Sequence, residues 1–251
     1  MIKSRIMQQD NMVFGLRPVI EAINSGKTID SLFIQTGLKG EIYAELKGLI
    51  KKYNLSSKQV PVERLNRFTR KNHQGIVAFI SPIDFHKIED ILPKLYEEGR
   101  IPLLLILDRI TDARNFGAIV RTAECTGVDA IIIPKKNTAP INADAIKTST
   151  GAIYNIPICK ESDLKIVIEY IQDYGIQVVA ASEKTNHMLY DLDFKLPTAF
   201  VMGSEENGVS LSYIKTAQKT AKLPMYGKTG SLNVSVACGA FLYECVRQRM
   251  G

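Results

Sequence analysis

The sequence has little that would place the protein in a membrane or an oxidising compartment. No run of about 18 apolar residues occurs, so we expect no transmembrane helix. The first ten residues, MIKSRIMQQD, lack the apolar stretch of a signal peptide. The four cysteines show no Cys-x-x-Cys spacing and have small or apolar neighbours; they are Cys125, Cys159, Cys238 and Cys245. We therefore expect reduced core cysteines in a cytoplasmic protein.

Motifs of several common chemistries are also absent. No Gly-x-Gly-x-x-Gly follows a predicted strand, which disfavours a nucleotide-cofactor oxidoreductase on a dinucleotide-binding sheet, and no P-loop occurs. The three histidines, His73, His86 and His187, lack the spacing of zinc ligands, so we expect no bound metal. No Ser/His/Asp set is evident either.

What the chain does contain is a globular composition with an uneven charge. Of its 251 residues, 45% are apolar and 23% are charged, which suits one large domain or two unequal ones. Residues 1–85 carry 13 lysines and arginines against 7 aspartates and glutamates, whereas residues 86–251 carry 19 of each. A basic module beside a neutral one suits a polyanion such as nucleic acid. A solvated surface with surplus lysine is the alternative, and charge alone does not choose between them.

The first third of the chain predicts a small α/β domain over residues 1–82. The expected helices cover 16–26 and 41–55, and the expected strands cover 31–37 and 75–82. Between them, RLNRFTRKNHQG (64–75) interleaves basic residues with Phe68 and His73. Arginines beside aromatic residues suit phosphate contacts and base stacking in RNA. An ordinary basic surface loop would have the same composition and is the alternative. The RNA-binding candidates in this loop are Arg64, Arg67, Arg70 and Lys71.

The rest of the chain predicts a doubly wound α/β domain over residues 102–251. Residues 83–101 are charged and contain Pro93, which interrupts a helical pattern, so we interpret them as a linker. The segment LLLILD (103–108) is a continuous apolar run of the kind buried on both faces of a parallel sheet. Strands and helices then alternate. Further strands are expected at 129–134, 176–182 and 198–203, and helices at 115–127, 144–153, 163–175 and the C-terminus.

Three strand ends in this domain are rich in polar residues and glycine, and ligands of such a sheet bind where strands end. The first loop, LDRITDARNFGAIVRTAE, follows the strand that ends at Asp108 and includes Asn115 and Arg121. Arg121 lies among apolar residues, where a buried arginine needs an anionic partner. That partner is either a ligand in a site, or Glu124 or Asp108 in a structural salt bridge.

The second and third loops hold the remaining polar candidates. FVMGSEENGVS (200–210) brackets the adjacent carboxylates Glu205 and Glu206 between two glycines, and an ordinary polar turn is the alternative. LPMYGKTGSLNVSVACGAFLYE (223–244) places Ser231 and Asn233 where the last helix should begin. These residues either cap the helix or face a ligand.

Taken in order, NFGAIVRTAE, VMGSEENG and LPMYGKTGSLNVSVACGAFLYE closely resemble the three signature motifs of the SpoU (TrmH) branch of the SPOUT RNA methyltransferases. VFGLRPVIEAI and NHQGIVAF are similar to that family's N-terminal substrate-binding domain, which is like ribosomal proteins that bind RNA. The resemblance covers nearly the whole chain. Its two-domain form is most similar to enzymes that methylate guanosine 2′-hydroxyls in large-subunit ribosomal RNA. Transfer RNA is the alternative substrate, and a catalytically inactive RNA-binding protein of the same fold is the alternative to an enzyme.

The resemblance implies a homodimer that uses S-adenosyl-L-methionine and whose C-terminal parallel sheet contains a deep trefoil knot. The residues it implies for the cofactor are Met202, Gly203, Leu223, Met225 and Leu232. Those it implies for catalysis are Asn115, Arg121, Glu205, Ser231 and Asn233, and Arg114 joins the RNA-binding candidates. Arginine keeps its proton, with a pKa above about 12, so we expect Arg121 to stabilise a developing oxyanion.

Two positions depart from the family pattern. Ala113 stands where relatives often carry proline, so the first loop is expected to be less rigid. Glu206 stands where glycine is usual, so the second loop is not expected to adopt a positive φ there.

Overall fold

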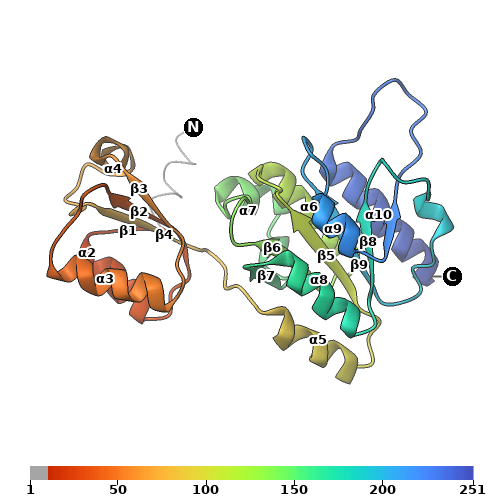
Figure 1. Cartoon of the computed structure of the whole chain (residues 1–251), viewed down its shortest axis with the longest axis horizontal. Coiled ribbons are helices and arrows are strands. Elements are labelled where there is room, and N and C mark those ends of the chain that lie inside the picture. Colours follow the sequence, from red (N-terminus) through yellow and green to blue (C-terminus); the bar gives the residue numbers. More distant parts are fainter. Residues whose placement is uncertain (1–10, 251) are drawn as a thin grey trace. The chain divides into compact units, whose positions relative to one another are not determined.

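The structure of the protein is a computed structural model that describes residues 11–250. The first ten residues, where we expect no signal peptide, lie outside the described part of the chain. The chain forms two compact units (Figure 1): the first holds the chain up to Asp84 together with Ile141–Ala143, and the second holds the remaining residues from Phe85 on. Each unit contains its own sheet. Within residues 11–250, no helix is long and apolar enough to cross a membrane.

The first unit is a four-stranded sheet, in the order β1-β4-β2-β3, with helices on both faces. Its elements are β1 (Met12–Phe14), α2 (Leu16–Asn24), β2 (Ile29–Gln35), α3 (Glu41–Lys52), β3 (Ser57–Val60), α4 (Val62–Phe68) and β4 (Ile76–Ile80). Successive side chains of a strand point to opposite faces. In β2, Leu32 and Ile34 therefore pack with α2 and α3, while Phe33 packs with α4. The predicted helices and strands are present, and β1, β3 and α4 are additional.

The basic segment at residues 64–75, for which base stacking in RNA was one of two interpretations, contributes both of its aromatic residues to packing. It begins inside α4, and its Phe68 packs with Phe33 and Phe79 at ring-centroid distances of 4.9 and 5.2 Å. His73 is only 8% exposed and is hydrogen-bonded through both ring nitrogens. His73 is therefore part of the packing of the unit and is not available for stacking. Phe68 is half-buried, so base stacking on this ring stays a prediction.

The second unit is the parallel α/β domain that the alternation predicted. Its six strands are all parallel and lie in the order β10-β8-β9-β5-β6-β7. They are β5 (Leu103–Asp108), β6 (Ala130–Pro134), β7 (Ile158–Glu161), β8 (Gln177–Ala181), β9 (Thr198–Gly203) and β10 (Lys219–Ala221). The sequence pattern missed β7 and β10, which are short and form the two edges of the sheet. The trefoil knot stays a prediction.

Helices cover both faces of this sheet (Figure 1). They are α5 (Ile88–Glu97), α6 (Ala113–Cys125), α7 (Ala143–Ser149), α8 (Leu164–Asp173), α9 (Leu211–Thr216) and α10 (Val234–Met250), with short turns η1 (Ala152–Tyr154) and η2 (Leu189–Asp191). In β9, Val201 packs in the core formed with α5 and α8. Its neighbour Phe200 faces the other way and meets Phe241 of α10 at a ring-centroid distance of 5.5 Å. The last helix thus lies against a central strand.

The segment 83–101, interpreted as a linker, contains helix α5 with Pro93 inside it. Ile88, Leu92 and Leu95 lie on one face of this helix and are buried in the core of the second unit. A proline inside a helix costs about 3 kcal/mol, whereas burying each large apolar side chain contributes about 1.5–3 kcal/mol. Packing therefore outweighs the proline, and most of the expected linker is part of the second unit.

Three of the four cysteines are buried as expected. Burial raises the pKa of the Cys159 and Cys238 thiols to about 12, so both are neutral at physiological pH. Cys125 is an exception, because it is exposed. It lies two residues beyond the buried Ala123 on α6, which places it about 200° around the helix from the buried face.

Candidate active site

The two central strands of the second unit end side by side. β5 and β9 pair in parallel, with Asp108 opposite Gly203, so the first and second loops start from adjacent points. In a parallel sheet all carboxyl ends lie at one edge, and β8 and β10 send their loops to the same edge. Residues far apart in the chain are therefore gathered there.

A buried carboxylate fixes the return of the second loop. Asp108 is 2% exposed, and its Oδ2 accepts hydrogen bonds from the Ser210 backbone nitrogen at 2.7 Å and hydroxyl at 2.6 Å. Arg109 Nε donates to Asp108 Oδ1 at 3.1 Å, and the Arg109 guanidinium donates to Gly208 O at 3.1 Å. Arg109 has a φ of 59°, a left-handed conformation that costs about 1–2 kcal/mol. Its contacts to Asp108 at the end of β5 and to Gly208 in the second loop offset that cost.

Gly203 lies where two backbone segments nearly touch. A Cβ atom at this position would lie 2.0 Å from the Gly208 carbonyl carbon and 2.1 Å from the Val209 nitrogen. Only glycine lets the end of β9 pass so close to the returning loop. The backbone of Gly203 therefore has a packing role, in addition to the cofactor contact that we expect.

Side chains from all three loops meet at Glu205. Its Oε1 accepts hydrogen bonds from Asn115 Nδ2 at 2.8 Å and from Asn233 Nδ2 at 2.6 Å. The Val234 backbone nitrogen also donates to this oxygen at 3.4 Å, and Asn233 Nδ2 lies 3.1 Å from Asn115 Oδ1. We call Asn115, Glu205 and Asn233 the Glu205 cluster. Glu205 and Asn233 are exposed and Asn115 is half-buried, so water weakens each single bond, and the cluster links the loops through several bonds that share one oxygen.

The two helices that reach the cluster carry their own N-caps. Asp112 Oδ1 accepts hydrogen bonds from the Arg114 and Asn115 nitrogens, at 2.9 and 2.8 Å, at the start of α6. Asn233 Oδ1 accepts from the Ser235 nitrogen at 2.9 Å at the start of α10. Asn233 therefore caps the helix with its side-chain oxygen, which is one of the two roles that the sequence left open, while its nitrogen joins the cluster.

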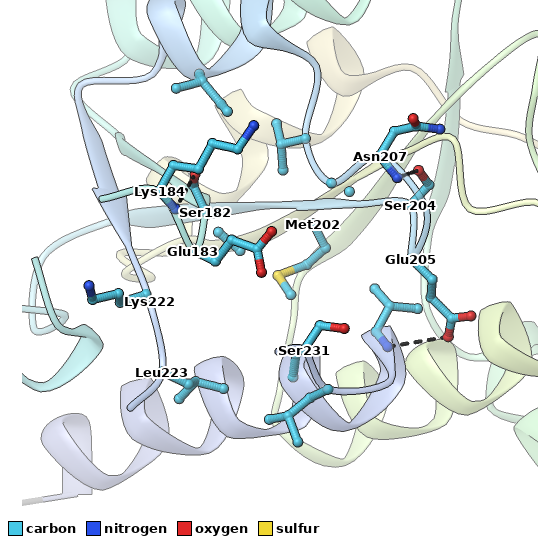
Figure 2. Close-up of a pocket in the computed structure, with 18 of the residues that line it drawn as sticks. Ser182, Glu183, Lys184, Met202, Ser204, Glu205, Asn207, Lys222, Leu223 and Ser231 are labelled. Atoms are coloured by element: carbon cyan, nitrogen blue, oxygen red, sulfur yellow. Dashed lines mark hydrogen bonds between the residues drawn. The ribbon is translucent and has the colours of Figure 1, made fainter. Parts of the chain in front are cut away.

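A cavity of about 910 Å³ opens at this edge of the sheet (Figure 2). This volume lies within the range of small-molecule sites, about 300–1,000 Å³. All the residues expected to bind the cofactor line it, and they are Met202, Gly203, Leu223, Met225 and Leu232. Glu205 and Ser231, from the expected catalytic set, also line it. Within residues 11–250, no group of three His, Cys, Asp or Glu side chains is placed to hold a metal ion.

Sequence reasoning missed two parts of the cavity wall. Ser182, Glu183 and Lys184 follow β8, and Arg109 follows β5. A signal for the first part was available, because IQVVAAS (176–182) is an apolar strand that runs directly into charged residues. It is a fourth strand end of the same kind as the three that were selected.

Arg121 does not line the cavity of its own chain. It is exposed on α6, and it makes no hydrogen bond or ion pair with residues 11–250. The alternative salt bridge, to Glu124 or to Asp108, is thus not formed, and Asp108 pairs with Arg109 instead. Asn115 and Asn233 are also absent from the cavity wall and are bonded to Glu205 instead.

The basic RNA-binding candidates are all exposed; they are Arg64, Arg67, Arg70 and Lys71 on the first unit and Arg114 on the first turn of α6. The Arg64 guanidinium lies 5.6 Å from the centroid of the Phe33 ring, so part of this side chain supports packing. That these residues bind RNA stays a prediction.

The two positions that depart from the family pattern are accommodated locally. Ala113 begins α6, whose N-cap is supplied by Asp112. In the second loop the positive φ falls on Gly208, at 62°, and not on Glu206. The second loop therefore turns without a glycine at position 206.

A parallel α/β sheet with a cavity at the carboxyl ends of its central strands defines a class of proteins that bind a small-molecule cofactor at that edge. Residues 102–243 match the model of the SpoU rRNA methylase family, and residues 12–86 match the model for RNA 2′-O ribose methyltransferase substrate binding. The chain belongs to the SpoU/TrmH family and is an RNA methyltransferase.

Individual relatives agree with this assignment. The chain is 33% identical to Bacillus subtilis (strain 168) YacO, which is assigned to the TrmH family of tRNA/rRNA methyltransferases, over 96% of this chain and 97% of that protein. An AdoMet-bound rRNA methyltransferase from Sinorhizobium meliloti is 26% identical, with a TM-score of 0.61 over 94% of this chain and 86% of that chain. The A. aeolicus TrmH/SpoU tRNA modifying enzyme is 32% identical, with a TM-score of 0.56 over 64% and 84%.

The close approach at Gly203 leads to a first prediction. Gly203→Ala should lower the free energy of unfolding by about 1–3 kcal/mol or more, because the methyl group of the alanine would overlap the backbone at Gly208. Urea unfolding measures this change. Gly230→Ala is the matched control, since Gly230 also lines the cavity but has nothing within 4 Å of an added Cβ. Equal unfolding midpoints for the two variants would contradict the packing role.

The Glu205 cluster leads to a second prediction. In a double-mutant cycle, Asn115→Ala and Glu205→Ala should show a coupling energy of about 1 kcal/mol or more, because each removes the same charge-assisted hydrogen bond. Shifts of the urea midpoint at constant slope measure it. The control cycle pairs Asn115→Ala with Glu206→Ala, which should be additive. Additivity in both cycles would show that the cluster carries no coupling energy.

Proposed function

We propose that this RNA methyltransferase modifies a ribose 2′-hydroxyl, at a guanosine of large-subunit ribosomal RNA. S-adenosylmethionine is the methyl donor. The observation that carries the proposal is the Glu205 cluster, which draws three loops around one cavity, within a chain that also holds a basic substrate-binding unit. A surface of exposed arginines and lysine suits the phosphates of a structured RNA.

The cavity suits a nucleoside-containing cofactor. Met202, Leu223 and Leu232 offer apolar surface to a base, and the glycine at the end of β9 leaves backbone groups accessible. Charges of both signs line the wall, and this balance suits a ligand that carries both positive and negative groups; they are Glu183, Glu205, Glu206, Arg109, Lys184 and Lys222. When bound, S-adenosylmethionine supplies a methyl group that is attached to a positively charged sulfur. The thioether that remains after methyl transfer is a good leaving group.

The chain's own residues then have to position the ribose and accommodate its proton. A site that holds the reacting groups in place and excludes water supplies much of the rate enhancement without a strong acid or a metal. Arg121, which keeps its proton, stabilises negative charge that develops on the 2′-oxygen and orients the adjacent phosphate. The hydroxyl proton leaves late in the reaction or through water.

Arg121 is exposed and does not line the cavity of its own chain, and we therefore include in the proposal a homodimer in which each copy supplies Arg121 to its partner. α6 and α10 pack together, and a Cβ added at Gly239 would lie 3.7 Å from Thr122 Cγ2, next to Arg121. Val236 and Tyr243 lie on the same face of α10 as Gly239 and are 57% and 56% exposed. A dimer face formed by α6 and α10 would bury these side chains and carry Arg121 to the partner's cavity.

Transfer RNA is the second candidate substrate, because the A. aeolicus tRNA modifying enzyme is 32% identical over 64% of this chain. The substrate-binding unit at residues 12–86 favours ribosomal RNA by analogy alone, because the rRNA methyltransferase from Sinorhizobium meliloti aligns over 94% of this chain and the tRNA modifying enzyme over 64%. An inactive RNA-binding protein is the remaining alternative. Binding of S-adenosylhomocysteine would argue against it, since a degenerate cavity should not hold that product.

The test of substrate is to map ribose methylation in cellular RNA with and without this gene. We expect one guanosine of large-subunit ribosomal RNA to lose its 2′-O-methyl group, and the wild-type gene to restore it. An Arg121→Ala gene should fail to restore it. Loss of a transfer RNA position would contradict the ribosomal assignment, and unchanged RNA together with no S-adenosylhomocysteine binding would contradict the enzyme.

The homodimer leads to a separate prediction from mixed dimers. Arg121→Ala and Ser231→Ala homodimers should each lose most methyl transfer, by about 10²-fold for the arginine. A co-purified dimer with one copy of each variant should recover up to about half of wild-type activity, because one of its two sites then combines an intact cavity with an intact Arg121. If the mixed dimer is as inactive as its parents, Arg121 acts on its own chain.

A further inference from the structure

One carboxylate in the cavity wall is not used by anything described so far. Glu183 follows β8, and Figure 2 shows its side chain directed into the cavity, toward Met202. Glu205 is turned away in the same view, toward the start of α10. Glu183 makes no hydrogen bond or ion pair with residues 11–250, so its two oxygens are available to a ligand.

The backbone that carries Glu183 is held on both sides. The Ser182 nitrogen donates to Ala221 O at 2.9 Å, which continues the pairing of β8 with β10. On the other side, Thr220 Oγ1 donates to Thr185 Oγ1 at 2.8 Å. Both anchors lie on β10, so Glu183 projects from a short turn of defined position. A ligand that meets it does not have to order the loop first.

The chemistry of a carboxylate at this place selects one part of the cofactor. An ionised carboxylate only accepts hydrogen bonds, and its two oxygens match two neighbouring hydroxyl donors. In nucleotide-binding parallel sheets, an acidic side chain at such an edge commonly accepts hydrogen bonds from ribose hydroxyls. The carboxylate of the cofactor's amino-acid part would be repelled, and Lys184 and Lys222 in the same wall are suited to it.

We propose that Glu183 is a cofactor-binding residue that accepts hydrogen bonds from the 2′- and 3′-hydroxyls of the adenosine ribose. This inference rests on the proposed function, since it requires S-adenosylmethionine in this cavity. It adds the loop after β8 to the three loops that the signature motifs cover. Glu183 acts on affinity, and the transferred methyl group lies elsewhere on the cofactor.

The test is calorimetric binding of S-adenosylhomocysteine to the full-length protein and its variants. Glu183→Gln and Glu183→Ala should each weaken binding by roughly 10- to 100-fold, the range for hydrogen bonds to a charged group. Glu97→Gln is the matched control, because Glu97 is an exposed glutamate outside the cavity, and it should bind as wild type does. Unchanged affinity in both Glu183 variants would overturn the proposal.

Two further ligands separate the ribose from the rest of the cofactor. The 3′-deoxyribose analogue of S-adenosylhomocysteine should bind wild type weakly, and Glu183→Ala should lower its affinity much less than that of the parent. S-adenosylmethionine should lose as much affinity as S-adenosylhomocysteine in the Glu183 variants. A loss confined to S-adenosylmethionine would assign Glu183 to the sulfonium charge and overturn the ribose contact. If wild type binds neither compound, the proposed function fails as well.

Discussion

One carboxylate oxygen ties the active site together. Glu205 Oε1 accepts hydrogen bonds from Asn115 and Asn233, which are 90 and 28 residues away in the chain. Ordering three polar loops costs conformational entropy, at about 1–2 kcal/mol for each fixed residue. Helix caps at Asp112 and Asn233 and the packing of α6 with α10 supply part of the compensation. The conformations of the three loops are therefore interdependent. Because these loops form much of the cavity wall, the shape of the cavity depends on all three.

Backbone crowding gives that wall its shape before any ligand arrives. The end of β9 lies so close to the second loop that a Cβ atom at Gly203 would overlap the backbone of Gly208. The end of this loop is fixed by the hydrogen bonds that Ser210 donates to Asp108. Arg109 adopts a left-handed φ to bond both Asp108 and Gly208. A site assembled in this way is preorganised, which suits a reaction that depends on positioning more than on acid or base strength.

Several sequence predictions succeeded because they rested on long, regular patterns. The continuous apolar run at 103–108 indicated a buried parallel strand, and β5 lies near the middle of the sheet. One interpretation differed from the structure where a local pattern competed with packing. Pro93 suggested a linker, yet the apolar face of α5 is buried in the core. The burial of that face stabilises the helix by more than the proline destabilises it, and no local pattern shows that burial.

The sequence by itself determined the parallel α/β class of the second unit, the basic character of the first third and the three loops where polar residues gather. Those properties depend on apolar periodicity and on charge, which are local. Only the tertiary structure decided that Asn115 and Asn233 turn toward Glu205, that Arg121 is exposed, and that Glu183 faces the cavity. The direction of a side chain on a loop depends on which distant segment packs against it. That partner is set by the order of strands in the sheet, and no local pattern records it.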